Sequence, residues 1–444
     1  MILISRWLAA PALAVTLALL GAGSVAAFDG FGTSTADSTY DQGMTFTIEL
    51  TGAAPDRLEL LLTTPGSDAV FVAPVPVRGA SATYTWDTAV DHVTPNTPVT
   101  YQWRAIEGDE VTLSDPATLR YEDDRPGLDW QSANLGDATV HWYGDAETQA
   151  RRFGELTAVG VQRAEDLLGT TLAGPVDVFV YQSRDDFFGA LGPGAREWTG
   201  AAAFTEIRTI FMWNSNSAGD QAYLEQAMIH EVTHVVFADA TDNPYHEPAR
   251  WLNEGIATWS EDFDGADEAA IVRVEASGGG LFAFEAIEAQ FPIGDRGGRL
   301  SYAQGTAMID RIVDTYGEES LAKIAAAYRD GASDAEALEA GTGVPAEQLY
   351  DDFYAAYGVD APEPIAPDPI PASNVDRPEA GPLDPGGVDV PATPPPGDGA
   401  PGEHDGSAGG DPGAPLVVGA LVVGAAAALA GALWLSRRAA RRAA

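Results

Sequence analysis

Polar and apolar residues alternate in short runs between residues 28 and about 122, and clusters of Pro, Gly, Asn and Asp separate the runs. Alternation with a period of two is typical of a β-strand that buries one of its faces. The runs predict strands at residues 45–50, 58–63, 69–72, 82–86, 99–105 and 117–121. Short strands at regular spacing, with turn signals between them, predict an all-β sandwich over residues 28–122.

From residue 130 onward the pattern predicts strands that alternate with helices, and then helices alone. Apolar residues three and four apart mark the helices, and short apolar runs mark the strands. The predicted elements are strands at 139–143 and 176–181, an edge hairpin at 204–213, and helices at 146–168, 220–239, 251–263, 300–316, 319–328, 334–339 and 346–357. We therefore expect an α+β domain over residues 130–360, which a hinge at residues 123–127 joins to the sandwich.

The predicted helix at 220–239 carries the run His230-Glu231-Val232-Thr233-His234. Residues four apart lie on one face of an α-helix, so both imidazoles can reach one metal ion. Glu231 is then aimed at a water on that ion and can take its proton. The chain has only 6 histidines, which makes a chance match to this spacing rare.

A second acidic motif supplies the ligand that this run lacks. A catalytic zinc ion takes three protein ligands and keeps a fourth position for water. The run Trp251-Leu252-Asn253-Glu254-Gly255 makes Glu254 the natural third ligand, because two histidines and one glutamate form a known hydrolytic zinc site. We therefore predict one zinc ion per chain, held by His230, His234 and Glu254. The expected reaction is metal-assisted hydrolysis, most often of a peptide bond.

These two motifs together resemble those of the gluzincin zinc metallopeptidases of the peptidase MA-like kind. The likeness is greatest to the thermolysin-like core of the membrane alanyl-type aminopeptidases, and it covers roughly residues 130–360. A third run, Ser301-Tyr302-Ala303-Gln304-Gly305, is similar to the Tyr-x-Lys-Gly-Ala helix start of that family. The resemblance implies that Tyr302 stabilises the tetrahedral oxyanion, and Gln304 stands where the family usually has Lys.

Two further positions bear on the mechanism. Glu261 matches an acidic residue of the family, two helical turns after Glu254, and is interpreted as a partner of a ligand histidine. The exopeptidase signature Gly-x-Met-Glu-Asn of the aminopeptidases is absent, and the corresponding stretch runs from Gly200 to Glu206. We therefore expect hydrolysis not to require a free substrate amino terminus.

Both ends of the chain carry targeting patterns. Residues 1–27 combine an early arginine, an apolar run and small residues before the predicted cut, which is typical of a secretory signal peptide. Residues 414–435 are almost all apolar and long enough to cross a bilayer. Arginines in residues 436–444 predict that this basic tail lies in the cytoplasm. The pattern predicts a single-pass cell-membrane protein with extracellular N-terminal domains.

Composition separates the last extracellular segment from the folded domains. Residues 361–413 are rich in Pro, Gly and acidic residues, cannot bury enough apolar surface to fold, and are interpreted as a disordered stalk. The chain has no cysteine, which excludes disulfides and thiolate ligands. Its formal net charge of −42 argues against a nucleic-acid partner.

The predicted fold class is multidomain: an N-terminal all-β sandwich like an immunoglobulin or fibronectin module, an α+β thermolysin-like zincin domain, a disordered stalk and a C-terminal transmembrane helix. The predicted function is a membrane-anchored extracytoplasmic zinc metallopeptidase that acts on peptides or proteins, with Glu231 activating a zinc-bound water. The alternative is a non-catalytic zinc-containing surface protein that recognises its partner through the sandwich. A purely structural envelope protein is the third interpretation.

Overall fold

The computed structural model describes residues 27–362, apart from residues 68, 193–194, 196–198, 216, 246, 262–265 and 293. The predicted stalk (361–413), transmembrane helix (414–435) and cytoplasmic tail (436–444) lie outside the described residues, except for the first two stalk residues, and so does the predicted signal peptide up to residue 26. Among the helices that are described, none combines the length and apolar character needed to cross a membrane.

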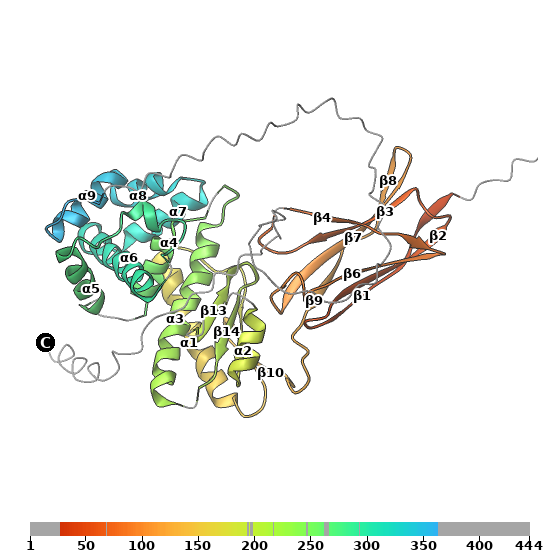
Figure 1. The fold of residues 1–444 in the computed structure, drawn as a ribbon, viewed down its shortest axis with the longest axis horizontal. Coiled ribbons are helices and arrows are strands. Elements are labelled where there is room, and N and C mark those ends of the chain that lie inside the picture. Colours follow the sequence, from red (N-terminus) through yellow and green to blue (C-terminus); the bar gives the residue numbers. More distant parts are fainter. Residues whose placement is uncertain are drawn as a thin grey trace, which may run out of the picture.

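The N-terminal region consists of two antiparallel sheets that face each other (Figure 1). One sheet has the order β1-β2-β6-β5, formed by Phe28–Thr39, Gly43–Gly52, Ser81–Trp86 and Val77–Arg78. The other has the order β4-β3-β7-β8, formed by Phe71–Pro74, Arg57–Thr63, Thr97–Glu107 and Glu110–Leu113, and β9 (Ala117–Tyr121) also pairs with β7. This matches the strand order of an immunoglobulin-type sandwich, with β4 as an added strand.

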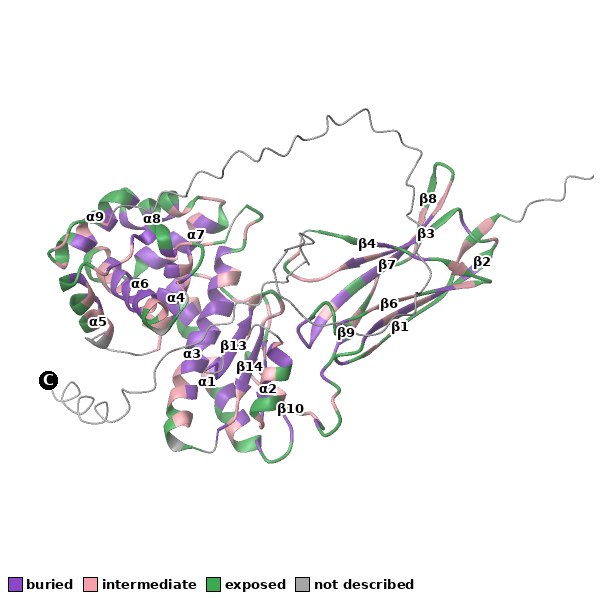
Figure 2. Ribbon diagram, viewed as in Figure 1, coloured by how far each residue is buried: buried purple, intermediate pink, exposed green. Residues whose placement is uncertain are grey.

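Alternating side chains build the core between these sheets. Along β7 every second residue is buried from Thr97 to Ala105, and this set includes Tyr101 and Trp103, which is wholly buried. The opposite sheet contributes buried apolar residues such as Phe46 and Ile48 to the same cluster. Figure 2 shows this buried layer between the two sheets. The predicted β-rich N-terminal region is therefore confirmed, and the sequence pattern missed only β1, β5 and β8 among its described strands.

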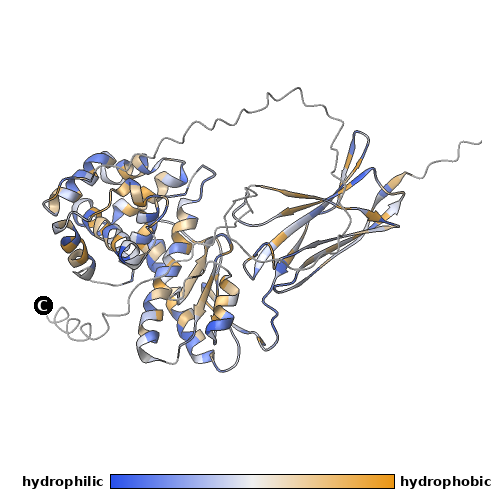
Figure 3. Ribbon diagram, viewed as in Figure 1, coloured by the Kyte–Doolittle hydropathy of each residue, from blue (hydrophilic) through white to orange (hydrophobic). Residues whose placement is uncertain are grey.

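The second domain begins with a five-stranded mixed sheet. Its order is β10-β11-β12-β14-β13, formed by Gln131–Leu135, Ala138–Trp142, Val176–Tyr181, Thr209–Trp213 and Ala201–Phe204. β11, β12 and β14 are parallel, and β13 returns antiparallel to β14 as the edge strand. Strands buried on both faces are expected to be almost wholly apolar. The central strands fit this expectation and are drawn in orange tones in Figure 3.

Helices cover this sheet and then form a bundle of their own. Helices α1 (Glu147–Leu168) and α3 (Ala218–Thr241) pack on one face, and α2 (Arg184–Leu191) packs near the other. The helices that follow are α4 (Arg250–Trp259), α5 (Ala266–Ser277), α6 (Asp295–Tyr316), α7 (Glu319–Arg329), α8 (Asp334–Thr342) and α9 (Ala346–Ala356). The predicted α+β architecture followed by helices is thus present.

The structure corrects several predicted boundaries. Helix α4 ends at Trp259, so Glu261 lies beyond the helix and not two turns along it. Helix α6 begins at Asp295, which places Tyr302 about two turns inside the helix and not in its first turn. The hairpin starts with β13 three residues earlier than predicted, and β10 and α2 were not predicted. Polar helix starts such as that of α6 weaken the apolar signal on which these boundaries depended.

Two glycines let the helices of the second and third motifs approach closely. A Cβ on Gly255 would lie 2.8 Å from the carbonyl carbon of Gly305, and one on Gly305 would lie 2.6 Å from the carbonyl oxygen of Trp251. Either substitution would therefore force backbone against backbone. The close crossing of α4 and α6 brings Glu254 and Tyr302, which precede these glycines, to the same region.

Candidate metal centre

Helix α3 and helix α4 bring three candidate ligands together in the interior. His230 and His234 lie one helical turn apart on α3, and both are at most 2% exposed. Glu254 on α4 is completely buried. The Nε2 atom of each histidine lies 3.4 Å from Oε2 of Glu254, and one ligand atom from each of the three residues lies within 4.8 Å of the others.

These atoms have the arrangement expected of metal ligands. His230 Nε2, His234 Nε2 and Glu254 Oε2 are buried and have no hydrogen-bond partner among the described residues. A separation of 3.4 Å is long for a hydrogen bond from nitrogen to oxygen. Two ligands that are each ~2.1 Å from a tetrahedral zinc ion are ~3.4 Å apart. The three residues therefore fit a zinc ion, which would satisfy all three atoms at once.

The other nitrogen of each imidazole is held by a second residue. His230 Nδ1 lies 2.7 Å from Oε1 of Glu261, and His234 Nδ1 lies 2.7 Å from Oδ1 of Asn253. An acceptor at Nδ1 fixes the proton there and leaves Nε2 free to bind a metal. The contact that the sequence predicted for Glu261 is present. The partner role of Asn253 was missed, although this residue stands directly before Glu254.

Glu231 lies beside the ligands and is anchored from the sheet. It is 2% exposed, and its Oε2 accepts a hydrogen bond of 2.9 Å from the backbone N–H of Ala203 in edge strand β13. Burial raises the pKa of Glu231 to about 7, against the opposing effect of the two imidazoles. A carboxyl group with a pKa near neutrality can both accept and return a proton. The sequence could not reveal the Ala203 contact, because a backbone donor has no side-chain signature.

The charges of the ligands influence one another in the metal-free protein. Burial alone would lower the pKa of His230, but the carboxylates of Glu254 and Glu261 raise it to about 10. Burial would raise the pKa of Glu254, but the two imidazoles hold it well below its usual value. Arg250, whose Nη2 lies 3.4 Å from Oε1 of Glu254, adds a further positive charge. The site therefore favours an ionised carboxylate.

Tyr302 lies next to the ligand histidines. Its ring centre is 6.3 Å from that of His230, and its side chain is partly buried. Burial, together with the negative charge of Glu254, raises the pKa of the Tyr302 phenol well above its usual value. The hydroxyl group therefore stays protonated and can donate a hydrogen bond. Phe291 packs edge-on against the ring at 5.3 Å and restricts its position.

Gln304 has a structural role that explains its departure from the family pattern. Its side-chain amide donates to the carbonyl oxygen of Phe282 at 2.8 Å and accepts from the N–H of the same residue at 3.1 Å. Tyr354 donates its hydroxyl to the same carbonyl at 2.7 Å. The completely buried amide thus holds the segment before α6 and is not directed at the ligand cluster by any of these contacts.

The geometry agrees with a comparison of the sequence with protein families. The model of the Peptidase MA superfamily matches residues 157–357. This match supports a gluzincin-like peptidase MA domain in this part of the chain. The match supports a metallopeptidase, as the motifs predict, and it includes every proposed ligand of the peptidase MA domain. The sequence matches no curated protein.

Similar solved structures share little sequence with this chain. The M1 zinc metallopeptidase from Deinococcus radiodurans has 14% sequence identity and a TM-score of 0.33, and the match covers 74% of this chain and 93% of that one. A Br derivative of BhCBM56 has 7% identity and a TM-score of 0.18, with 22% of this chain and 99% of that one covered. At these TM-scores neither likeness bears on the function of the peptidase MA domain.

Proposed function

We propose that the peptidase MA domain hydrolyses peptide bonds with a zinc ion held by His230, His234 and Glu254. The observation that carries this proposal is the convergence of three buried ligand atoms that form no hydrogen bond with any described residue. When bound, zinc supplies a Lewis acid that polarises the substrate carbonyl and brings the pKa of a water toward neutrality. The remaining steps depend on residues of the chain itself.

Glu231 is the proposed general base and then the general acid. The N–H of Ala203 fixes the carboxylate at one oxygen, and the other oxygen is the proposed acceptor for the proton of the attacking water. Glu231 takes a proton from that water and later gives it to the leaving amine. Its raised pKa, about 7, suits both transfers near neutral pH. The peptide bond breaks when the nitrogen receives this proton.

Tyr302 is the proposed donor to the oxygen that becomes negative during the attack. Its protonated phenol lies beside His230, and such a donor acts mainly on the transition state. Arg250 neutralises part of the charge of Glu254 and orients that ligand. Burial of all these groups strengthens each electrostatic interaction, because little water screens them.

The proposed substrate is a peptide that extends along edge strand β13. An edge strand offers unpaired backbone groups to a second extended chain, and the Ala203 contact shows that β13 lies beside Glu231. Since the Gly-x-Met-Glu-Asn signature is absent, we expect no requirement for a free amino terminus. From the terminal sequence patterns we also propose an extracytoplasmic location, with a C-terminal membrane anchor.

The test is peptide hydrolysis by the purified protein. We expect cleavage of peptides with free and with blocked amino termini, loss of cleavage with a chelator, and recovery after addition of zinc. Cleavage of free amino termini only, together with dependence on Glu206, would favour an aminopeptidase. Zinc binding without any cleavage would favour the non-catalytic alternative. For the anchor, protease added to intact cells should release a soluble fragment by cutting within residues 361–413.

A further inference from the structure

The sandwich and the peptidase domain meet at a junction built from distant parts of the sequence. Four residues from different segments of the sandwich contact the peptidase domain, through a hydrogen bond, an ion pair and two close packings against glycine. The pairs are Tyr40 with Gly189, Arg120 with Asp177, His92 with Gly192, and Gly66 with Glu206. Because the contacts are spread over several loops and strands, they fix the orientation of the sandwich.

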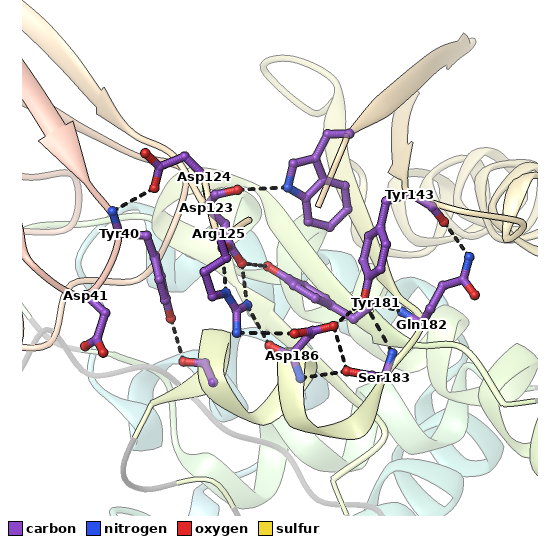
Figure 4. Close-up of polar contacts among 12 residues, drawn as sticks. Tyr40, Asp41, Asp123, Asp124, Arg125, Tyr143, Tyr181, Gln182, Ser183 and Asp186 are labelled. Atoms are coloured by element: carbon purple, nitrogen blue, oxygen red, sulfur yellow. Dashed lines mark hydrogen bonds and ion pairs between the residues drawn. The ribbon is translucent and has the colours of Figure 1, made fainter. Parts of the chain in front are cut away.

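Arg125, in the linker between the domains, is at the centre of this junction (Figure 4). Its guanidinium donates to both oxygens of Asp123, at 2.7 and 2.6 Å. It also donates to the carbonyl oxygen of Asp186 in α2 at 2.8 Å. The same group lies 4.8 Å from the ring centre of Tyr40 and 6.0 Å from that of Tyr181. One side chain therefore joins the linker, the sandwich and the peptidase domain.

The buried charge of Asp123 makes this arrangement specific. Asp123 is 2% exposed, and the hydroxyl of Tyr181 donates to its carboxylate at 3.1 Å. Separating a buried carboxylate from its partner leaves an uncompensated charge, which is strongly unfavourable. Tyr40 adds a hydrogen bond of 2.6 Å to the carbonyl of Gly189 in α2. The linker segment, predicted as a hinge, is therefore fixed at both domains.

This fixed orientation places one loop of the sandwich at the edge of the peptidase sheet. Gly66, between β3 and β4, contacts Glu206 in the short helix η1 (Thr205–Ile207), which follows β13. A Cβ on Gly66 would lie 3.0 Å from Cβ of Glu206 and closer still to its Cγ. Glu206 comes three residues after Ala203, a distance of at most ~10 Å. Since Ala203 contacts Glu231, the loop lies at one end of the edge that faces the candidate metal centre.

We propose that the sandwich forms a wall of the substrate path in the peptidase domain. The junction around Arg125 holds the β3–β4 loop against η1, and the loop limits how far a peptide along β13 extends on one side of the scissile bond. A bound peptide that runs along β13 would have room for about three extended residues between the position beside Glu231 and Gly66. This inference deepens the proposed peptidase function and rests on it.

The test begins with a series of peptides that share one cleavage site and are lengthened by one residue at a time at either end. In the wild-type protein we expect kcat/KM to fall by ~10-fold or more once one side exceeds about three residues, as for other steric limits of a binding site. Lengthening at the other end should have no such effect. Equal tolerance of both extensions would overturn the proposal.

A reversible cross-link then tests the role of the loop. The chain has no cysteine, so Gly66→Cys with Glu206→Cys creates a single cysteine pair. The Cβ separation of 3.0 Å is below the range found in a disulfide, ~3.5–4.5 Å, so the loop must shift slightly outward to form the bond, and the new cysteine in the loop must keep the φ of +74° that Gly66 adopts. Asp123→Asn with Arg125→Met removes the charged pair Asp123–Arg125 together, and Asp186, 3.8 Å from Arg125, keeps its hydrogen bonds from Tyr143 and Ser183. This double variant should weaken the length limit, the oxidised cross-link should restore it, and a reductant should abolish it again.

Two controls keep the result interpretable. Arg78→Met, an exposed arginine in β5 of the same sandwich, should leave the length limit unchanged. Binding of the same peptides to the Glu231→Gln protein separates the two proposals. If peptide binding shows the one-sided length limit but the wild type cleaves no peptide, the proposed peptidase function is wrong. The proposal that the sandwich limits the substrate path would still stand. If the double variant cleaves peptides with the same length dependence with and without the cross-link, the sandwich does not limit the substrate path. The proposed peptidase function would still stand.

Discussion

The metal centre and the domain junction both bury carboxylates, but the hydrogen bonding of these carboxylates differs between the two regions. At the metal centre, Oε2 of Glu254 and the Nε2 atoms of both ligand histidines are buried without a hydrogen-bond partner among the described residues. At the junction, the equally buried Asp123 receives hydrogen bonds from Arg125 and Tyr181. Unpaired buried polar atoms are costly, whereas a fully paired network favours one arrangement. The first pattern indicates a site for a ligand, and the second indicates a structural lock.

The largest expected effect comes from the catalytic base and the ligands. Glu231→Gln keeps the shape of the side chain but cannot take a proton, so we expect turnover to fall by ~10²–10⁴-fold with zinc content unchanged. His230→Ala should lose both zinc and activity. The measurement is zinc per chain by mass spectrometry together with kcat. His141→Ala, which removes a histidine bonded to Asp177, is the matched control and should keep its zinc. Full zinc in His230→Ala would refute the ligand assignment.

The next effect separates Tyr302 from the base. Tyr302→Phe removes one donor to the developing oxyanion, so kcat should fall by ~10²–10³-fold. KM and zinc content should change little, because the donor acts mainly in the transition state. Tyr84→Phe in the sandwich serves as the control for a lost tyrosine hydroxyl. Undiminished kcat in Tyr302→Phe would show that the role implied by the family resemblance does not apply to this chain.

A variant of the domain junction should lose stability and keep its zinc content. Arg125→Met leaves the buried Asp123 without its cation, and loss of one member of a buried pair typically costs ~3–5 kcal/mol of stability. The double variant with Asp123→Asn should recover part of this loss, because the buried Asp123 charge is removed together with its cation. Unfolding in denaturant measures both, and zinc content should not change. If the two variants are equally unstable, the unpaired charge is not the cause.

The sequence predicted the metal centre better than the junction, for a physical reason. The positions of His230 and His234 follow from helical spacing, which is local, and Glu254 follows from the ligand count of zinc. The Arg125 cluster joins residues up to 149 positions apart in the chain, as in the Tyr40–Gly189 contact. No periodicity marks such a meeting, so the pattern indicated only a linker.

The same reason explains the errors and omissions around the metal centre. Ala203 acts through its backbone N–H, and any residue except proline could do so at this position. Glu261 was predicted as a partner from a family match and from helical spacing, yet it reaches His230 from beyond the end of α4. Gln304 stands where the family usually has a lysine, but the contacts of its side chain are with the backbone of Phe282. Residue type indicated the chemistry in these cases, and tertiary packing decided the partner.

A smaller effect is expected from the residues that hold the ligand histidines. Glu261→Ala and Asn253→Ala each remove the acceptor at one Nδ1, and loss of such a partner typically weakens metal binding by ~10–100-fold. Competition with a chelator measures the zinc affinity. Glu275→Ala, which removes an ion pair with Arg296 away from the ligands, is the control and should retain wild-type affinity. Unchanged affinity in both test variants would show that the ligands are held by packing alone.

The smallest effect is a pH dependence of the metal-free protein. The pKa of Glu231, raised mainly by burial to about 7, lies above its ordinary value of 4.5, so the folded state binds the extra proton. This contribution to stability is complete below pH 4.5 and disappears as the pH rises through about 7. Glu231→Gln cannot lose it, so with chelator present its Tm should exceed that of the wild type by ~7–14 °C at pH 8 and match it at pH 4.5. His230 titrates in both proteins, and because Glu231 is one of the charges that raise its pKa, the Tm difference includes this coupling. A Tm difference that does not vary with pH would mean that the buried carboxyl group does not titrate in this range, and its assignment as a proton acceptor near neutral pH would lose its support.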